Sequence, residues 1–156
     1  MKKSSISILF ILFILSIINA QSPSDDSRAI NMLRSFYVSY DSAWISIDNH
    51  NALKNQLLFL QQNYCSDSLQ GVVNEYYNKF GLDHDLFLDD AMPDMATFVA
   101  TLTVIKDTTR VNSYIVSFTY NVNNPGETGQ RQIALRVGVV NVNNSLKINS
   151  VESYQN

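Results

Sequence analysis

The spacing of apolar residues changes once along this 156-residue chain, and that change constrains the fold more than any other feature. Before Gly81, apolar side chains recur three and four residues apart, which is typical of helices with one buried face. From Met95 onward they alternate with polar residues, which is typical of antiparallel strands with one face against a core. The sequence therefore predicts an α+β domain in which helices are followed by a sheet.

The first predicted helix begins near Ser27 and is ended by the polar group 48–51. On this spacing its solvent-facing side carries Arg34, Ser35 and Asp41. Its buried stripe consists of apolar residues three or four positions apart: Ile30, Leu33, Phe36, Tyr37, Tyr40 and Trp44.

Two shorter helices are predicted to follow. One covers residues 51–62. The next begins after Ser66 or Asp67, because either side chain can accept a hydrogen bond from the free N–H groups of the first turn. Gly81 is well placed to end it, since glycine adopts the left-handed conformation at low cost.

The second half predicts about four antiparallel strands in a meander, curved over the helices. Turn-forming residues separate the strands at 106–109, 123–126 and 143–144. The alternating segments cover 98–104, 113–120, 132–139 and 146–154.

The N-terminus has the order of a secretory signal peptide. Lys2 and Lys3 precede an apolar run over 6–18, and Ala20 is small enough for the cleavage site. Thirteen apolar residues are too few for a permanent membrane span, so we expect export to the periplasm or medium without a stable membrane anchor. The expected organisation is a signal peptide over 1–20, a flexible leader over 21–27 and a single α+β domain over 28–156.

The net charge disfavours one class of partner, and the cysteine count excludes an internal disulfide. Loss of Lys2 and Lys3 leaves nine basic against fourteen acidic residues, a net charge of −5, which disfavours nucleic acid as a partner. Cys65 is the single cysteine, so no internal disulfide is expected. Its favoured interpretation is a half-buried small hydrophobic residue, ahead of a redox or nucleophilic role. We expect a monomer or homodimer.

An acidic segment, residues 82–94, connects the helical first part of the chain to the strand-forming second part. A calcium loop of the EF-hand type fails here, because Leu88 occupies the sixth position from Asp83, where glycine is required. We favour a solvated connection, and expect His84→Ala and Asp85→Ala to change stability by less than about 1 kcal/mol. The weaker alternative is an acidic binding loop formed by Asp83, His84, Asp85, Asp89 and Asp90.

No catalytic or metal-binding pattern is present in the sequence. His50 and His84 are the two histidines, and they lack the ligand spacing of a zinc site. Neither a Gly-x-Ser-x-Gly motif nor a glycine-rich phosphate loop occurs. The expected catalytic residues, metal and cofactor are therefore none.

The aromatic residues allow two interpretations. They form either a packed core, which we favour, or the lining of a pocket for a small apolar or amphipathic ligand. The candidate lining residues are Tyr37, Tyr40, Trp44, Tyr77, Tyr114, Phe118 and Tyr120.

Four segments carry a family resemblance: 36–40, 64–69, 82–88 and Asp94 before the first long strand. Together they resemble the exported YbjP/YqhG-like domain family, grouped with the nuclear-transport-factor-2-like, cystatin-like folds. The resemblance covers about residues 28–154. It implies a cone in which a long helix, two shorter helices and a curved sheet surround a pocket. The family has no established catalytic residues to transfer.

These observations lead to two functional hypotheses. The favoured one is an exported, non-catalytic binding or protein-interaction domain for an unidentified small molecule or protein, of which an inhibitor or immunity-type role is one form. The alternative is a small pocket enzyme, such as an isomerase, dehydratase or hydrolase with an Asp–His or Asp–Tyr pair. A carboxylate and a histidine that project into one cavity would favour the second.

Overall fold

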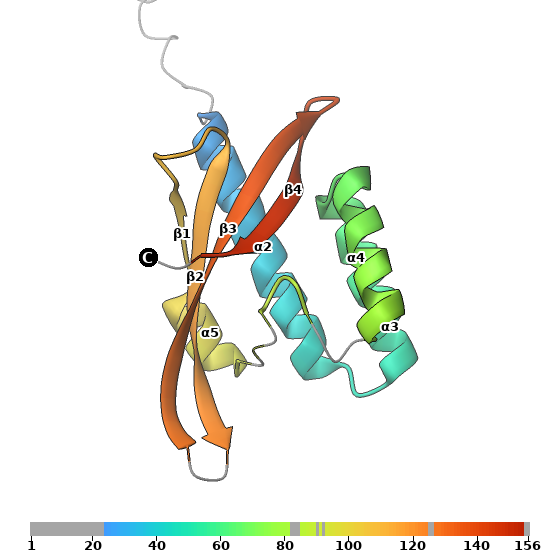
Figure 1. Cartoon of the computed structure of the whole chain (residues 1–156), viewed down its shortest axis with the longest axis vertical. Helices are drawn as coiled ribbons and strands as arrows, with labels where there is room; N and C mark the ends of the chain where they lie inside the picture. The colour runs from blue at the N-terminus through green and yellow to red at the C-terminus, as the bar shows by residue number, and fades with distance from the viewer. Residues whose placement is uncertain (1–23, 82–84, 90, 92, 125–126, 155–156) are drawn as a thin grey trace, which may run out of the picture.

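A computed structural model describes residues 24–81, 85–89, 91, 93–124 and 127–154. Over these residues the chain forms four helices and an open antiparallel sheet of four strands, which confirms the α+β prediction (Figure 1). Helix α2 packs against β1, β4 and α5, while α3 and α4 lie beside β4. The elements are α2 (Asp25–Ser46), α3 (His50–Tyr64), α4 (Asp67–Phe80), α5 (Met95–Thr101), β1 (Thr103–Lys106), β2 (Ser113–Asn124), β3 (Glu127–Val142) and β4 (Ser145–Ser153).

Helix α2 starts slightly earlier than its apolar stripe indicates. Ser24 is the cap, and its hydroxyl oxygen accepts a hydrogen bond from the Ser27 N–H. Asp25 and Asp26 in the first turn favour this start, because carboxylates interact well with the positive end of the helix dipole. The last residues of the expected flexible leader are therefore helical.

The boundaries of α3 and α4 follow from their caps. Asn49 accepts a hydrogen bond from the Ala52 N–H, which starts α3 at His50. Ser66 accepts one from the Leu69 N–H and so caps α4 as predicted. Gly81 ends α4 with φ 71° and ψ −156°, a conformation that is open almost only to glycine.

Gly81→Ala is expected to lower the free energy of unfolding by about 1–3 kcal/mol, because alanine is strained in this conformation. Gly71 is a matched control in the same helix, with nothing within 4 Å of an added methyl group. Gly71→Ala is expected to stabilise the protein by about 0.5–1 kcal/mol. Urea unfolding of both variants measures the contrast, and equal effects would contradict this account of the helix end.

One segment predicted as strand is helical. Residues 95–101 form α5, because Asp94 caps the segment by accepting the Thr97 N–H at 2.9 Å. The apparent alternation there does not reflect burial, since Phe98 is buried and Val99 is half exposed. The first strand therefore begins at Thr103 instead of near Phe98.

The four strands form the predicted meander in the order β1-β2-β3-β4. Val116 in β2 lies opposite Val104 in β1 and Leu135 in β3, so the buried residues of neighbouring strands share one face. Asn143 and Asn144 both have positive φ, 51° and 65°, as a tight two-residue hairpin turn requires. This turn was correctly identified from the sequence.

The core lies between the sheet and the helices. Phe118 in β2 is fully buried, and Trp44 in α2 packs, partly buried, against the same cluster, as predicted. Phe36 contacts the rings of Tyr37, Tyr40 and Phe87 at centroid distances of 5.0–5.4 Å. In this part of the molecule the aromatic residues form a packed core.

Candidate functional site

The region where α2, α3, α4 and the segment after α4 meet contains buried polar groups. Asp41, Gln61 and Asp85 are 0%, 2% and 6% exposed, respectively. Asp41 was predicted to face solvent, and its burial corrects that expectation. We call the group the polar core cluster, and it consists of Tyr37, Tyr40, Asp41, Trp44, Gln61, Tyr77 and Asp85. Asp41 belongs to it by its place on α2, four residues after Tyr37 and three before Trp44.

A chain of hydrogen bonds joins three helices inside this cluster. Gln61 Nε2 donates to the Tyr77 hydroxyl at 3.2 Å, and the hydroxyls of Tyr77 and Tyr40 are 2.7 Å apart. Tyr40 donates to Asp85 Oδ2 at 2.7 Å. Because an amide nitrogen donates and a carboxylate accepts, each hydroxyl in the chain donates toward Asp85.

Asp85 fastens its segment to the core. Its Oδ1 accepts the backbone N–H groups of Phe87 and Leu88, both at 2.8 Å. Burial raises the pKa of Asp85, and the hydrogen bonds from Tyr40, Leu88 and Phe87 oppose this shift. The expectation of a solvated connection is therefore wrong at this residue, which acts as a buried anchor.

Asp41 has the same side chain in a different environment. Neither of its carboxylate oxygens has a hydrogen-bond partner among the described residues. Burial raises its pKa to about 7, and repulsion by Asp94 at the start of α5 contributes to the rise. A carboxyl in this state can hold or release a proton near neutral pH.

Two more polar groups of α2 lack hydrogen bonds within the described part of the chain. They are the Tyr37 hydroxyl and the Trp44 indole N–H, both buried. The Trp44 N–H lowers the pKa of Asp85, so it is directed toward that carboxylate without completing a hydrogen bond. Residues 37, 41 and 44 are four and three positions apart, which places them on one face of α2.

The residues predicted to line a pocket do not all lie together in the structure. Tyr37, Tyr40, Trp44 and Tyr77 all belong to the polar core cluster. The Tyr114 hydroxyl instead donates to Asp26 Oδ1 at 2.7 Å near the start of α2. The remaining two lie elsewhere in the core region: Phe118, which pairs with Phe98 of α5, and partly buried Tyr120.

The residues of the predicted acidic binding loop do not form one site among the described residues. Asp83, His84 and Asp90 lie outside the described residues. Asp89 is exposed and accepts a hydrogen bond from the Ser153 hydroxyl at 2.8 Å. Of this set, Asp85 is therefore the residue that the structure brings to the polar core cluster.

Sequence reasoning missed Asp41 and Gln61 as site residues. For Asp41 a signal was present, because position 41 lies four residues after Tyr37 and three before Trp44, on the apolar stripe. A charged residue on a buried stripe indicates a special role. Gln61 carries no comparable signal in the sequence.

Two further kinds of reactive group were candidates: the thiol of Cys65 and clusters of side chains that could bind a metal ion. Cys65 is fully buried, where the sequence predicts a half-buried residue. Burial raises the pKa of its thiol to about 12, which disfavours the nucleophilic thiolate. Within the described ranges, no three His, Cys, Asp or Glu side chains are arranged to hold a metal ion. No helix in those ranges is long and apolar enough to cross a membrane.

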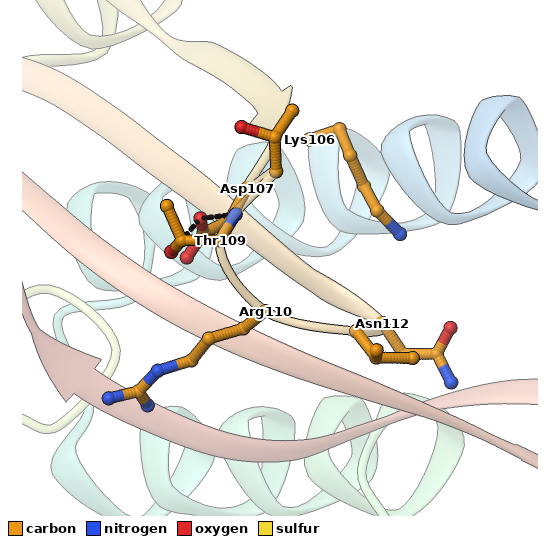
Figure 2. Close-up of a pocket in the computed structure, with 7 residues that line it drawn as sticks. Lys106, Asp107, Thr109, Arg110 and Asn112 are labelled. Carbon is orange, nitrogen blue, oxygen red and sulfur yellow. Dashed lines mark hydrogen bonds between the residues drawn. The ribbon is translucent and has the colours of Figure 1, made fainter.

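A surface hollow of about 440 Å³ lies along the loop between β1 and β2, and it is a weaker candidate (Figure 2). Its charged groups already have partners: Lys106 with Asp26, Asp107 with Arg136, and Arg110 with Glu152, at 2.7–3.2 Å. Figure 2 also shows the Lys106 and Arg110 side chains extending in different directions. The hollow therefore has no convergent charged group for a ligand.

Comparison with known proteins yields a likeness of fold. No protein-family model and no curated protein matches the chain. The crystal structure of a protein of unknown function from Bacteroides thetaiotaomicron is similar, with a TM-score of 0.66 and 24% sequence identity. The similarity covers 81% of this chain and 90% of that one. At this identity the likeness shows the fold alone.

Proposed function

We propose that this chain is an exported, nuclear-transport-factor-2-like domain that binds a small molecule at the polar core cluster. The observation that carries the proposal is the buried Asp41 carboxylate, which has no hydrogen-bond partner among the described residues. The Tyr37 hydroxyl supports it, since it is also buried without a hydrogen bond among the described residues and lies on the same face of α2.

A polar group buried without a partner costs about 1–3 kcal/mol, and a charged one costs more. Native proteins keep few such groups, and those that persist commonly belong to binding or catalytic sites. A ligand that hydrogen-bonds Asp41 recovers this free energy on binding. The folded protein is then arranged for a partner that the described side chains do not supply.

The experiment compares compounds that remain bound to the protein. Wild type, Asp41→Asn and Asp48→Asn are isolated from the envelope fraction, denatured, and their released small molecules are identified by mass spectrometry. Asp48 is an exposed carboxylate just beyond α2 and serves as the control. We expect a compound enriched at least about tenfold on wild type and Asp48→Asn over Asp41→Asn, the effect of losing about 1.4 kcal/mol. Equal recovery from all three would contradict the proposal.

Export is proposed on the basic, apolar and small-residue order of the first twenty residues. N-terminal sequencing of the protein from its host is expected to begin at or near Gln21. Finding an intact Met1 on the folded protein in the cytoplasm would contradict export. The cone-like relationship to the YbjP/YqhG-like family is proposed on the quoted segments and agrees with the order of helices and strands.

A pocket enzyme is the second candidate function, and one observation favours it. The pKa of Asp41 is raised to about 7, which lies near the optimum for a general acid or base at neutral pH. Under this hypothesis Asp41 transfers the proton and the Tyr37 hydroxyl assists. Conversion of the released compound by wild type but not by Asp41→Asn would establish catalysis, and its recovery unchanged would favour simple binding.

A further inference from the structure

We infer that the ligand presents a protonated primary amine to Asp41. This inference rests on the proposed function, because it concerns the chemical class of the molecule held at the polar core cluster. The charge around Asp41 and the balance of hydrogen-bond donors and acceptors there both favour an ammonium group.

The charge around Asp41 favours a cation. Lys, Arg and His are absent from the buried side chains within the described part of the chain, whereas three aspartates are buried there. Asp107, one of the three, pairs with Arg136 at 2.8 Å. The charged neighbour that acts on Asp41 is Asp94, which is another anion. An anionic ligand would meet repulsion here, and a cation would supply the missing opposite charge.

The Asp94 carboxylate is already occupied. Its Oδ1 accepts the Thr97 N–H at 2.9 Å, and its Oδ2 accepts from Asn121 Nδ2 at 3.0 Å. It therefore adds negative potential without competing for the ligand's donors. Asp41, whose two oxygens are both available among the described groups, is the acceptor that remains.

A primary ammonium group matches this set of acceptors. It has three N–H donors and no acceptor, like the end of a lysine side chain. Asp41 offers two carboxylate oxygens, neither of which has a hydrogen-bond partner among the described residues. A neutral alcohol has one donor and would leave part of this set unsatisfied.

The test uses simple amines and their uncharged counterparts. A series from methylamine through butylamine to benzylamine is titrated against the full mature protein in phosphate buffer, since Tris is itself a primary amine. Each amine is paired with the alcohol of the same shape. Trp44 is the sole tryptophan, so its fluorescence reports on this site, and calorimetry provides a second readout.

We expect at least one amine to bind wild type and Asp48→Asn at least tenfold more tightly than its paired alcohol, and Asp41→Asn to lose that preference. Tight binding should also require the ionised carboxylate, so affinity should rise between about pH 5.5 and pH 8. Equal binding of amines and alcohols, with no effect of Asp41→Asn, would overturn the amine assignment while leaving a binding site. Absence of binding by every amine would also overturn it, whereas the released compounds test the proposed function separately.

Discussion

Asp85→Ala is expected to lower the free energy of unfolding by about 3–5 kcal/mol. The substitution leaves three buried donors without an acceptor: the Tyr40 hydroxyl and the N–H groups of Phe87 and Leu88. Each orphaned donor costs about 1–3 kcal/mol, and relief from burying a carboxylate offsets part of the total. This result would reverse the expectation from the sequence, which treated Asp85 as an ordinary surface residue.

Asp85→Asn is the informative companion, because it keeps one acceptor oxygen for the two backbone N–H groups. Its amide would donate to Tyr40, so the hydroxyls of Tyr40 and Tyr77 would both turn and donate toward Gln61, whose amide can rotate to accept. We expect a cost of about 0.5–1.5 kcal/mol.

Urea unfolding measures both Asp85 variants against Asp89→Asn, a control on the exposed side of the same segment. The control is expected to remain within about 0.5 kcal/mol of wild type. If Asp85→Ala proves as mild as the control, Asp85 is not the anchor described above.

Asp41→Asn is expected to stabilise the protein near pH 8 by up to about 4 kcal/mol and to flatten its pH dependence. In the folded protein the pKa of Asp41 is raised from 3.8 to about 7. Three pKa units correspond to about 4 kcal/mol, an upper value because an unpaired asparagine amide is also costly to bury. A site residue that reduces stability in this way is typical of a trade between function and stability.

The direction of the pH effect follows from proton binding. Between about pH 4 and pH 7 the folded protein holds the Asp41 proton and the unfolded chain does not, so stability falls as pH rises through this window. The raised pKa of Asp85 acts in the same direction. The pKa values of Asp26, Asp94 and Asp107 are lowered, so their contribution is lost only as the pH falls below about 4.

Urea unfolding of wild type and Asp41→Asn across about pH 4–8 would measure this difference. The two proteins should be closest in stability near pH 4 and diverge as the pH rises, with the variant more stable. Parallel curves would show that Asp41 does not titrate in this range. Asp48→Asn, the exposed control, should follow wild type throughout.

The two core aspartates show why burial alone does not define a site. Asp85 is saturated by hydrogen bonds from Tyr40, Phe87 and Leu88, so its effect is structural. Asp41 has no such bonds within the described residues, and its stability cost is explained if a ligand supplies them. The predicted outcomes are opposite in sign: loss of Asp85 should weaken the fold, and loss of the Asp41 charge should strengthen it.

Much of the fold could be predicted because the relevant interactions are local. The Ser66 cap, the glycine at the end of α4 and the Asn143–Asn144 turn each depend on residues within a few positions of one another. Helix α5 was missed although Asp94 is a normal cap, because a short helix shows too few turns for its period to be distinguished from a strand.

The sequence by itself determined the order of the first three helices and the four strands, the meander and the aromatic nature of the core, since periodicity and turn chemistry are properties of neighbouring residues. Only the tertiary structure decided which polar residues are buried and which of them are satisfied. Asp85 meets Tyr40 across 45 positions, and Tyr40 meets Tyr77 across 37. Such contacts arise from packing distant segments together, so the anchor at Asp85 and the unpaired carboxylate at Asp41 became visible only in the folded chain.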